Sequence, residues 1–179
     1  MTQSGAGIGG GAAELRRAFD RSFSVAPSEA MVALDHLLAL RVAGIAYAVR
    51  MSASAGLYSA KHISRVPSLA PAFHGIAAFR GAIVPVYDLH TLLGYPPVAA
   101  PKWLLIAAAN VPVAFAFEHF EGHLRVSGDA FSAMEKGHSS RHAQEMVRVA
   151  ETSRHVIDVP SVVDAILKLA PPRTQTREP

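Results

Sequence analysis

Histidine is the residue type in this chain best suited to metal binding or acid–base chemistry, with nine copies among 179 residues. Two pairs are spaced four residues apart, His119 with His123 and His138 with His142. If the first pair lies on an extended strand, its members are ~13 Å apart, too far for one ion. The second pair could share a helical face, but it lies in a polar stretch without a third ligand. We therefore interpret them as surface histidines and expect no metal site.

Carboxylates are the next candidates for catalysis. Asp88 and Glu118 each follow an apolar, strand-like run, and neither has a second carboxylate at a local spacing that would form an acid–base pair. Asp88 precedes a leucine-rich turn, a position that favours capping of a short helix. The chain has no cysteine and no G-x-S-x-G, P-loop or H-E-x-x-H motif. We expect no catalytic residue, no enzymatic activity and no cofactor.

The two ends of the chain differ in composition from the middle. Residues 1–33 begin with a glycine-rich run, and within them Ala12–Phe23 has apolar residues at every fourth position, which predicts a short amphipathic helix. We interpret 1–33 as a flexible leader whose helix is either a docked or frayed terminus or a partner-binding element. Residues 34–170 are expected to form one domain, and 171–179 a disordered tail.

The middle of the chain consists of short apolar runs divided by turn signals. Ala43-Gly44 and Arg80-Gly81 each separate two such runs, as tight hairpin turns do. Many short strands with little helix between them predict an all-β domain rather than βαβ units. The expected strands are Leu37–Val42, Ile45–Met51, Ile76–Phe79, Ala82–Tyr87, Trp103–Ala109, Val113–Glu118, His123–Val126, Met146–Ala150 and Val156–Val159.

One pattern occurs twice, in Val84–Leu93 and in Arg154–Val163. Each segment reads as an apolar strand, then an aspartate, then apolar residues one, four and five positions further on. Asp88 and Asp158 are therefore expected to cap short helices by accepting backbone N–H groups, which is worth ~1 kcal/mol. The repeat is short, but it indicates two related halves.

The segment from His74 to Leu89 resembles the signature of CheW-like domains, which reads G-V-x-N-L-R-G-x-I-V-P-V-x-D-L. The shared residues are Gly75, Arg80, Gly81, Ile83, Val84, Pro85, Val86, Asp88 and Leu89. Weaker likeness in the flanking strands extends the resemblance to about residues 34–170. The sequence departs from the family pattern at Ala78, near Gly56 and at Glu118, which indicates a divergent branch of the family.

This resemblance implies both a fold and a role. The implied fold has two small five-stranded SH3-like barrel lobes around a shared hydrophobic core, with short helices at the N-terminus, after Asp88 and at the C-terminus. The implied role is that of a non-enzymatic adaptor between the cytoplasmic tip of methyl-accepting chemoreceptors and the regulatory domain of a CheA-type histidine kinase. Phe79, Arg80 and Gly81 are the expected partner-binding residues, because a tight turn would hold a long cation at a lobe edge.

Charge and hydropathy limit the other classes of function. The net charge of +3 is scattered along the chain, and aromatic residues make up only 7%, so a nucleic-acid-binding β-barrel is the weaker alternative. The longest apolar stretch, Trp103–Phe117, is interrupted by Asn110 and Pro112 and is too short to span a bilayer. No secretory signal is visible. We expect a cytoplasmic protein that neither binds nucleic acid nor inserts into a membrane.

Overall fold

A computed structural model describes residues 34–60, 62–68, 70–134 and 141–169. All of them belong to the unit Ala33–Pro179. The expected leader 1–33 with its helix Ala12–Phe23, the tail 171–179 and His138 lie outside the described residues. The domain boundaries therefore stay predictions.

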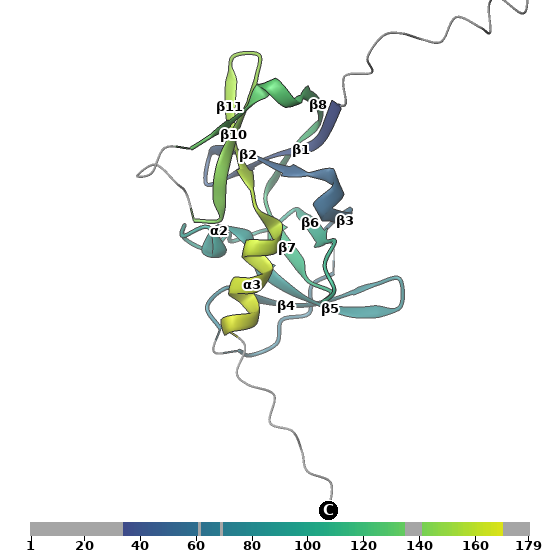
Figure 1. Cartoon of the computed structure of the whole chain (residues 1–179). Coiled ribbons are helices and arrows are strands. Elements are labelled where there is room, and N and C mark those ends of the chain that lie inside the picture. Colours follow the sequence, from purple (N-terminus) through teal and green to yellow (C-terminus); the bar gives the residue numbers. More distant parts are fainter. Residues whose placement is uncertain (1–33, 61, 69, 135–140, 170–179) are drawn as a thin grey trace, which may run out of the picture. The chain divides into compact units, whose positions relative to one another are not determined.

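The described residues form two sheets and two helices (Figure 1). Sheet A consists, in spatial order, of β8 (His119–Ser127), β1 (Leu34–Val42), β2 (Ile45–Arg50), β11 (Thr152–Ile157), β10 (Ala143–Val149) and β9 (Phe131–Ala133). Sheet B consists of β3 (Ser54–Ser59), β6 (Trp103–Ala107), β7 (Ala114–Phe117), β5 (Ala82–Asp88) and β4 (Phe73–Phe79). The helices are α2 (Leu89–Leu92) and α3 (Val159–Leu169), and the short 3-10 segments are η1 (Met51–Ala53) and η2 (Gly128–Ala130).

The two predicted hairpin turns are present. Strands β1 and β2 pair antiparallel up to Val42 and Ile45, and β4 and β5 pair up to Phe79 and Ala82. In each two-residue turn both residues have positive φ, 47° at Arg80 and 83° at Gly81 in the second hairpin. Such turns match the right-handed twist of the strands that they join.

The two sheets have the same arrangement of strands once β9 is set aside. In sheet A the hairpin β1–β2 lies beside the hairpin β10–β11, with β2 parallel to β11 and β8 outside β1. In sheet B the hairpin β6–β7 lies beside the hairpin β4–β5, with β7 parallel to β5 and β3 outside β6. Strands β5 and β11, which lead into Asp88 and Asp158, hold equivalent places. The two related halves that the repeated pattern indicates therefore correspond to sheet A and sheet B, which share one arrangement of strands.

The expected pair of five-stranded barrels needs two corrections, while the all-β class and the shared core are confirmed. Sheet A has six strands, because the short strand β9 adds to the free side of β10. Among the described residues neither sheet closes by backbone pairing: β8 and β9 are the edges of sheet A, and β3 and β4 are the edges of sheet B. Strands β3 and β9 are also the two that the sequence pattern did not predict.

Side chains, rather than backbone bonds, connect the two edges of sheet B. Tyr58 on β3 and Phe79 on β4 have ring centroids 5.0 Å apart, although their strands lie at opposite edges. Ser64 exchanges backbone hydrogen bonds of 2.8 and 2.9 Å with Ile76 of β4, which occupies part of that edge. The sheet therefore curls far enough for its edges to meet around a small interior cluster that includes Ala77, Val84 and Leu104.

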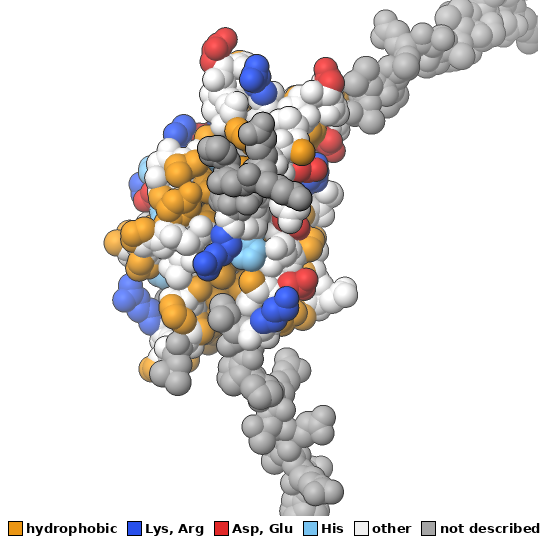
Figure 2. Space-filling view, turned by 60° about the vertical axis from the view of Figure 1, so that its left-hand side comes forward, with side chains coloured by type: hydrophobic (Ala, Val, Ile, Leu, Met, Phe, Trp, Pro, Cys, Tyr) orange, Lys and Arg blue, Asp and Glu red, His pale blue; other side chains and the backbone are white. Residues whose placement is uncertain are grey.

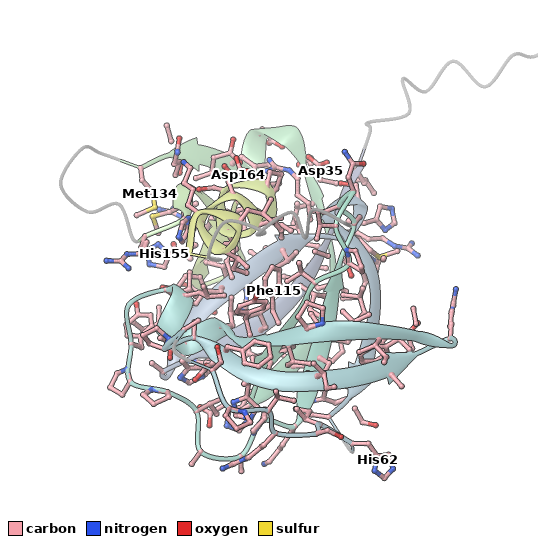
Figure 3. The ribbon with its side chains drawn as sticks, turned by 90° about the horizontal axis from the view of Figure 1, so that it is seen from below. Asp35, His62, Phe115, Met134, His155 and Asp164 are labelled. Carbon is pink, nitrogen blue, oxygen red and sulfur yellow. The ribbon has the colours of Figure 1, made fainter. Side chains whose placement is uncertain are left out.

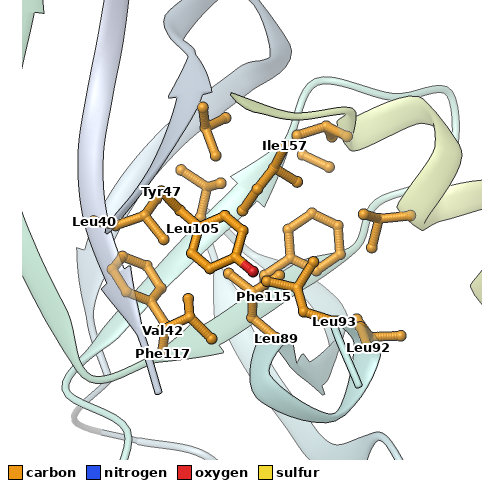
Figure 4. Packing of buried hydrophobic residues seen from close by; sticks show 14 of the residues in the cluster. Leu40, Val42, Tyr47, Leu89, Leu92, Leu93, Leu105, Phe115, Phe117 and Ile157 are labelled. Atoms are coloured by element: carbon orange, nitrogen blue, oxygen red, sulfur yellow. The ribbon is translucent and has the colours of Figure 1, made fainter. Parts of the chain in front are cut away.

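The main hydrophobic core lies between the two sheets (Figure 4). Figure 3 places Phe115 near the centre of the described unit, where it is 1% exposed. The other large members come from sheet A, from sheet B and from both helices: Leu40, Val42, Tyr47, Ile157, Leu105, Phe117, Leu89, Leu92, Val162 and Ile166. Burial of such side chains is worth ~1.5–3 kcal/mol each. Each sheet therefore depends on the other to cover its inner face.

Both aspartates of the repeated pattern accept a backbone hydrogen bond at the start of a helix. Asp88, 2% exposed, accepts from the N–H of His90 at 2.9 Å. Asp158 is exposed and accepts from the N–H of Ser161 at 3.3 Å. The buried carboxylate of Asp88 also accepts hydrogen bonds from Thr91 and Val98.

Candidate functional site

The turn between β4 and β5 presents the three residues that the resemblance implies for partner binding. Arg80 and Gly81 are exposed, and Phe79 is half-buried. The hairpin also carries Ile83, which pairs with Ala78 across the ladder and is 70% exposed. A cation on a rigid turn next to an exposed aliphatic side chain is suited to binding a protein surface that has both acidic and apolar groups.

A hollow of about 340 Å³ lies beside this turn. Its walls include Tyr58 and Phe79, whose rings meet across the open side of sheet B, and Leu104 beneath them. Arg80 and His62 also line it, and Figure 3 shows His62 pointing away from the ribbon. The hollow joins the exposed cation to an aromatic wall, so that we treat the turn and the hollow as one candidate site.

Two of the departures from the family pattern fall at this candidate site. Ala78 is exposed on β4, one residue before Phe79. At Gly56 an added Cβ would lie 2.7 Å from a ring carbon of Tyr58, so a side chain there would require the ring to move. The glycine thus accommodates the Tyr58 ring that forms part of the wall. The third departure, Glu118, is half-buried at the end of β7, 4.0 Å from His119.

A larger groove of about 490 Å³ lies where η1, the β6–β7 loop and α3 come together. Its apolar lining includes Ala53, Val111 and Val163, and Leu167 is 47% exposed at its side. No local signal could identify these residues, because they come from three segments far apart in the chain.

Titratable groups with shifted pKa values lie on different elements and have local causes. Partial burial alone would raise the pKa of Glu121, but hydrogen bonds and charges from Arg154 and Arg41 outweigh it and hold the pKa below its usual value. Burial lowers the pKa of His155, whose ring is tilted by 40° against that of Tyr47 with the centroids 5.3 Å apart. Glu121 thus ties β8 to β1 and β11 as an ionic clamp.

Surface charge is mixed on the face that Figure 2 shows. Basic and acidic side chains are scattered among hydrophobic ones there, without a continuous basic stripe. Within the described ranges, no group of three or more His, Cys, Asp or Glu residues is placed to hold a metal ion. None of the helices in the same ranges is long and apolar enough to cross a membrane.

The fold and the candidate site together define a class of protein: an all-β domain of two like sheets whose exposed groups are suited to binding another protein. The family model described as CheW-like domain matches residues 36–167, and the chain therefore belongs to the CheW-like domain family. This is a family of scaffold and adaptor proteins of chemotaxis signalling rather than of enzymes.

A solved structure supports the same fold. The crystal structure of the scaffolding protein TtCheW from Thermoanaerobacter tengcongensis superimposes with a TM-score of 0.64 over 70% of this chain and 89% of that chain. The two sequences are 13% identical, so this likeness concerns the fold alone. No curated protein sequence is similar enough to this chain to count as a match.

Proposed function

We propose that this protein is a cytoplasmic, non-enzymatic adaptor that couples chemoreceptors to a CheA-type histidine kinase. The observation that carries the proposal is the match of a CheW-like domain model to residues 36–167, which include the signature turn at Arg80. The kinase partner would be its regulatory domain, and the receptor partner its cytoplasmic tip. The described geometry supports the proposal at two surfaces, the β4–β5 turn with its hollow and the groove beside α3.

Arg80 is the side chain best placed to bind a partner at the turn. Its side chain is exposed, and within the described part of the chain it forms no hydrogen bond or ion pair. The left-handed φ of 47° at Arg80 and 83° at Gly81 fixes the direction of the backbone beneath it. A guanidinium held in this way can bind a carboxylate through two parallel hydrogen bonds.

The groove beside α3 offers a complementary kind of contact. Val163 and Leu167 lie one helical turn apart on α3, with Val111 of the β6–β7 loop in the same groove. Apolar side chains of a partner helix would cover this lining, and Asp164 adds one acidic group within it. Partners that engage both the groove and the Arg80 turn would be held at two separate points of the unit.

Binding measurements with both partners test the proposal. Purified full-length chain is expected to co-elute with the kinase regulatory domain or with the receptor tip, and Arg80→Ala is expected to weaken one of these complexes at least 10-fold, about 1.4 kcal/mol. Because Arg80 is exposed, the variant should keep the unfolding midpoint of the wild type. Arg148→Ala, which removes an exposed arginine from β10 of sheet A, is the matched control and should bind normally.

Two outcomes would count against the proposal. Absence of binding to either partner by the wild-type chain would reject the adaptor role, and salt-sensitive oligonucleotide binding in its place would favour the nucleic-acid-binding alternative. An unfolded Arg80→Ala variant would show that Arg80 stabilises its own turn rather than a complex.

A further inference from the structure

We propose that His36 and His123 form a binding site for a divalent transition-metal ion on the outer strand pair of sheet A. His36 lies on β1 and His123 on β8, 87 residues later in the chain. Their side chains are exposed, and Nδ1 of His36 lies 2.9 Å from Nε2 of His123. The ring centroids are 5.0 Å apart with the ring planes inclined by only 24°.

The separation of the two nitrogens suits a shared ion. Imidazole nitrogens lie ~2.0–2.1 Å from a bound divalent ion, so two of them on neighbouring corners of a square or octahedron are ~2.9 Å apart. Square-planar or tetragonal coordination by nitrogen and oxygen is typical of Cu²⁺ and Ni²⁺. Both ions bind imidazole well, and Cu²⁺ is the strongest binder of the divalent first-row series. The imidazole ligands therefore favour Cu²⁺ first and Ni²⁺ second.

The hydrogen-bonded histidine pair can convert to a metal site without rearrangement of the backbone. In the present contact one ring nitrogen must donate its hydrogen to the lone pair of the other. When an ion binds, the donating ring moves this proton to its second nitrogen, and small side-chain rotations aim both lone pairs at the ion. The antiparallel ladder between β1 and β8 holds both residues in place.

The surroundings set limits on the strength of the site. Within the described residues no third protein ligand is grouped with the pair, so water would complete the coordination shell. Arg125, the ladder partner of His36, places a cation on the neighbouring strand and weakens the site by repulsion. This pair could not be expected from the sequence, because its two histidines lie 87 residues apart in the chain.

Titration of the full-length, tag-free chain with Cu²⁺ and with Ni²⁺ tests this site. We expect one equivalent of Cu²⁺ to bind first, and His36→Ala or His123→Ala to weaken that step at least 10-fold, with no further loss in the double variant. His119→Ala, which removes another exposed histidine of β8, should retain wild-type affinity within about twofold. Equal affinity in all variants, or an equal loss in His119→Ala, would overturn the proposal.

A second measurement does not depend on the variants. Substoichiometric Cu²⁺ should broaden the amide NMR signals around His36 and His123 before any others, because a paramagnetic ion relaxes nearby nuclei. The ion should also raise the melting temperature, since residues 87 positions apart in sequence are brought together only in the folded state. First broadening at other histidines would show that this pair is only a hydrogen bond.

Discussion

Two aspartates occupy equivalent places in the two sheets, yet the structure gives them different importance. The Asp88 carboxylate, 2% exposed, accepts from the N–H groups of His90 and Val98 at 2.9 and 2.8 Å and from the Thr91 hydroxyl at 3.2 Å. It thus connects the start of α2 to a loop ten residues further on. Asp158 is exposed, and its carboxylate accepts a hydrogen bond of 3.3 Å from the N–H of Ser161.

Substitution of the two aspartates should destabilise the protein to different extents, because Asp88 connects a helix to a loop whereas Asp158 only caps a helix. Asp88→Ala would leave two backbone N–H groups without their acceptor, and we expect the free energy of unfolding to fall by about 3 kcal/mol. Asp158→Ala loses one exposed bond and should cost about 0.5–1 kcal/mol. Urea unfolding of the three proteins measures both values, and equal losses would show that the bonds to Val98 and Thr91 contribute nothing.

Sequence reasoning at this scale succeeded where the partners are close in the chain. The hairpin turn at Arg80-Gly81 was predictable from residues directly next to each other, and its exposure followed from the turn. Two side-chain contacts could not be predicted from the sequence, Tyr58 with Phe79 and His36 with His123. Each contact joins two strands whose relative position depends on the whole topology. The groove beside α3 could not be predicted from the sequence for the same reason.

At the scale of elements, the edge strand β4 shows how one glycine shapes a ladder. The pairing of β4 with β5 is irregular between Phe73 and Gly75, and Gly75 has a φ of 143°, outside the range that other residues readily adopt. A Cβ at this position would overlap the carbonyl oxygen of Ser64, whose segment bridges to Ile76. The glycine therefore permits the segment around Ser64, between β3 and β4, to cover part of the edge of sheet B. Unpaired backbone groups at such an edge would favour association with another chain.

Gly75→Ala should disturb this edge far more than other glycine substitutions do. The steric overlap with Ser64 adds to the backbone strain, and we expect a loss of about 3 kcal/mol or more in the free energy of unfolding. Gly94→Ala is the matched control, because Gly94 also has positive φ, 92°, but open space around its missing Cβ. It should lose only about 1–2 kcal/mol from strain. A comparable loss in both variants would mean that the contact with Ser64 relaxes without cost.

The strands themselves were largely predictable, and their order was not. Alternating apolar runs indicated nine of them, whereas β3 and β9 lack this signal: Ser54–Ser59 is rich in small residues, and Phe131–Ala133 is only three residues long. Nothing local shows that β2 pairs in parallel with β11 and so joins the first and last parts of the domain in one sheet. That pairing follows from covering one shared core.

At the scale of the whole described unit, the shared core predicts that both sheets unfold together. Leu104 and Leu105 are neighbours on β6, each 1% exposed, and they face opposite clusters. Leu105 packs in the core between the sheets, and Leu104 packs inside sheet B. If the two sheets form one cooperative unit, loss of either side chain destabilises sheet A and sheet B alike.

Leu104→Ala and Leu105→Ala should each lower the free energy of unfolding by about 2–4 kcal/mol, as large-to-small core substitutions do. Fluorescence of Trp103, the single tryptophan, reports on the junction of the two sheets, because its ring on β6 lies 5.5 Å from that of Phe120 on β8. Hydrogen exchange of amides in β4 and β5 reports on sheet B, and exchange of amides in β2 and β11 reports on sheet A. Within each protein, wild type or variant, all three probes should give the same midpoint in urea. Exchange of β4 and β5 amides at a lower urea concentration than those of β2 and β11 in Leu104→Ala would show that sheet B can open alone, and that the core between the sheets does not couple them.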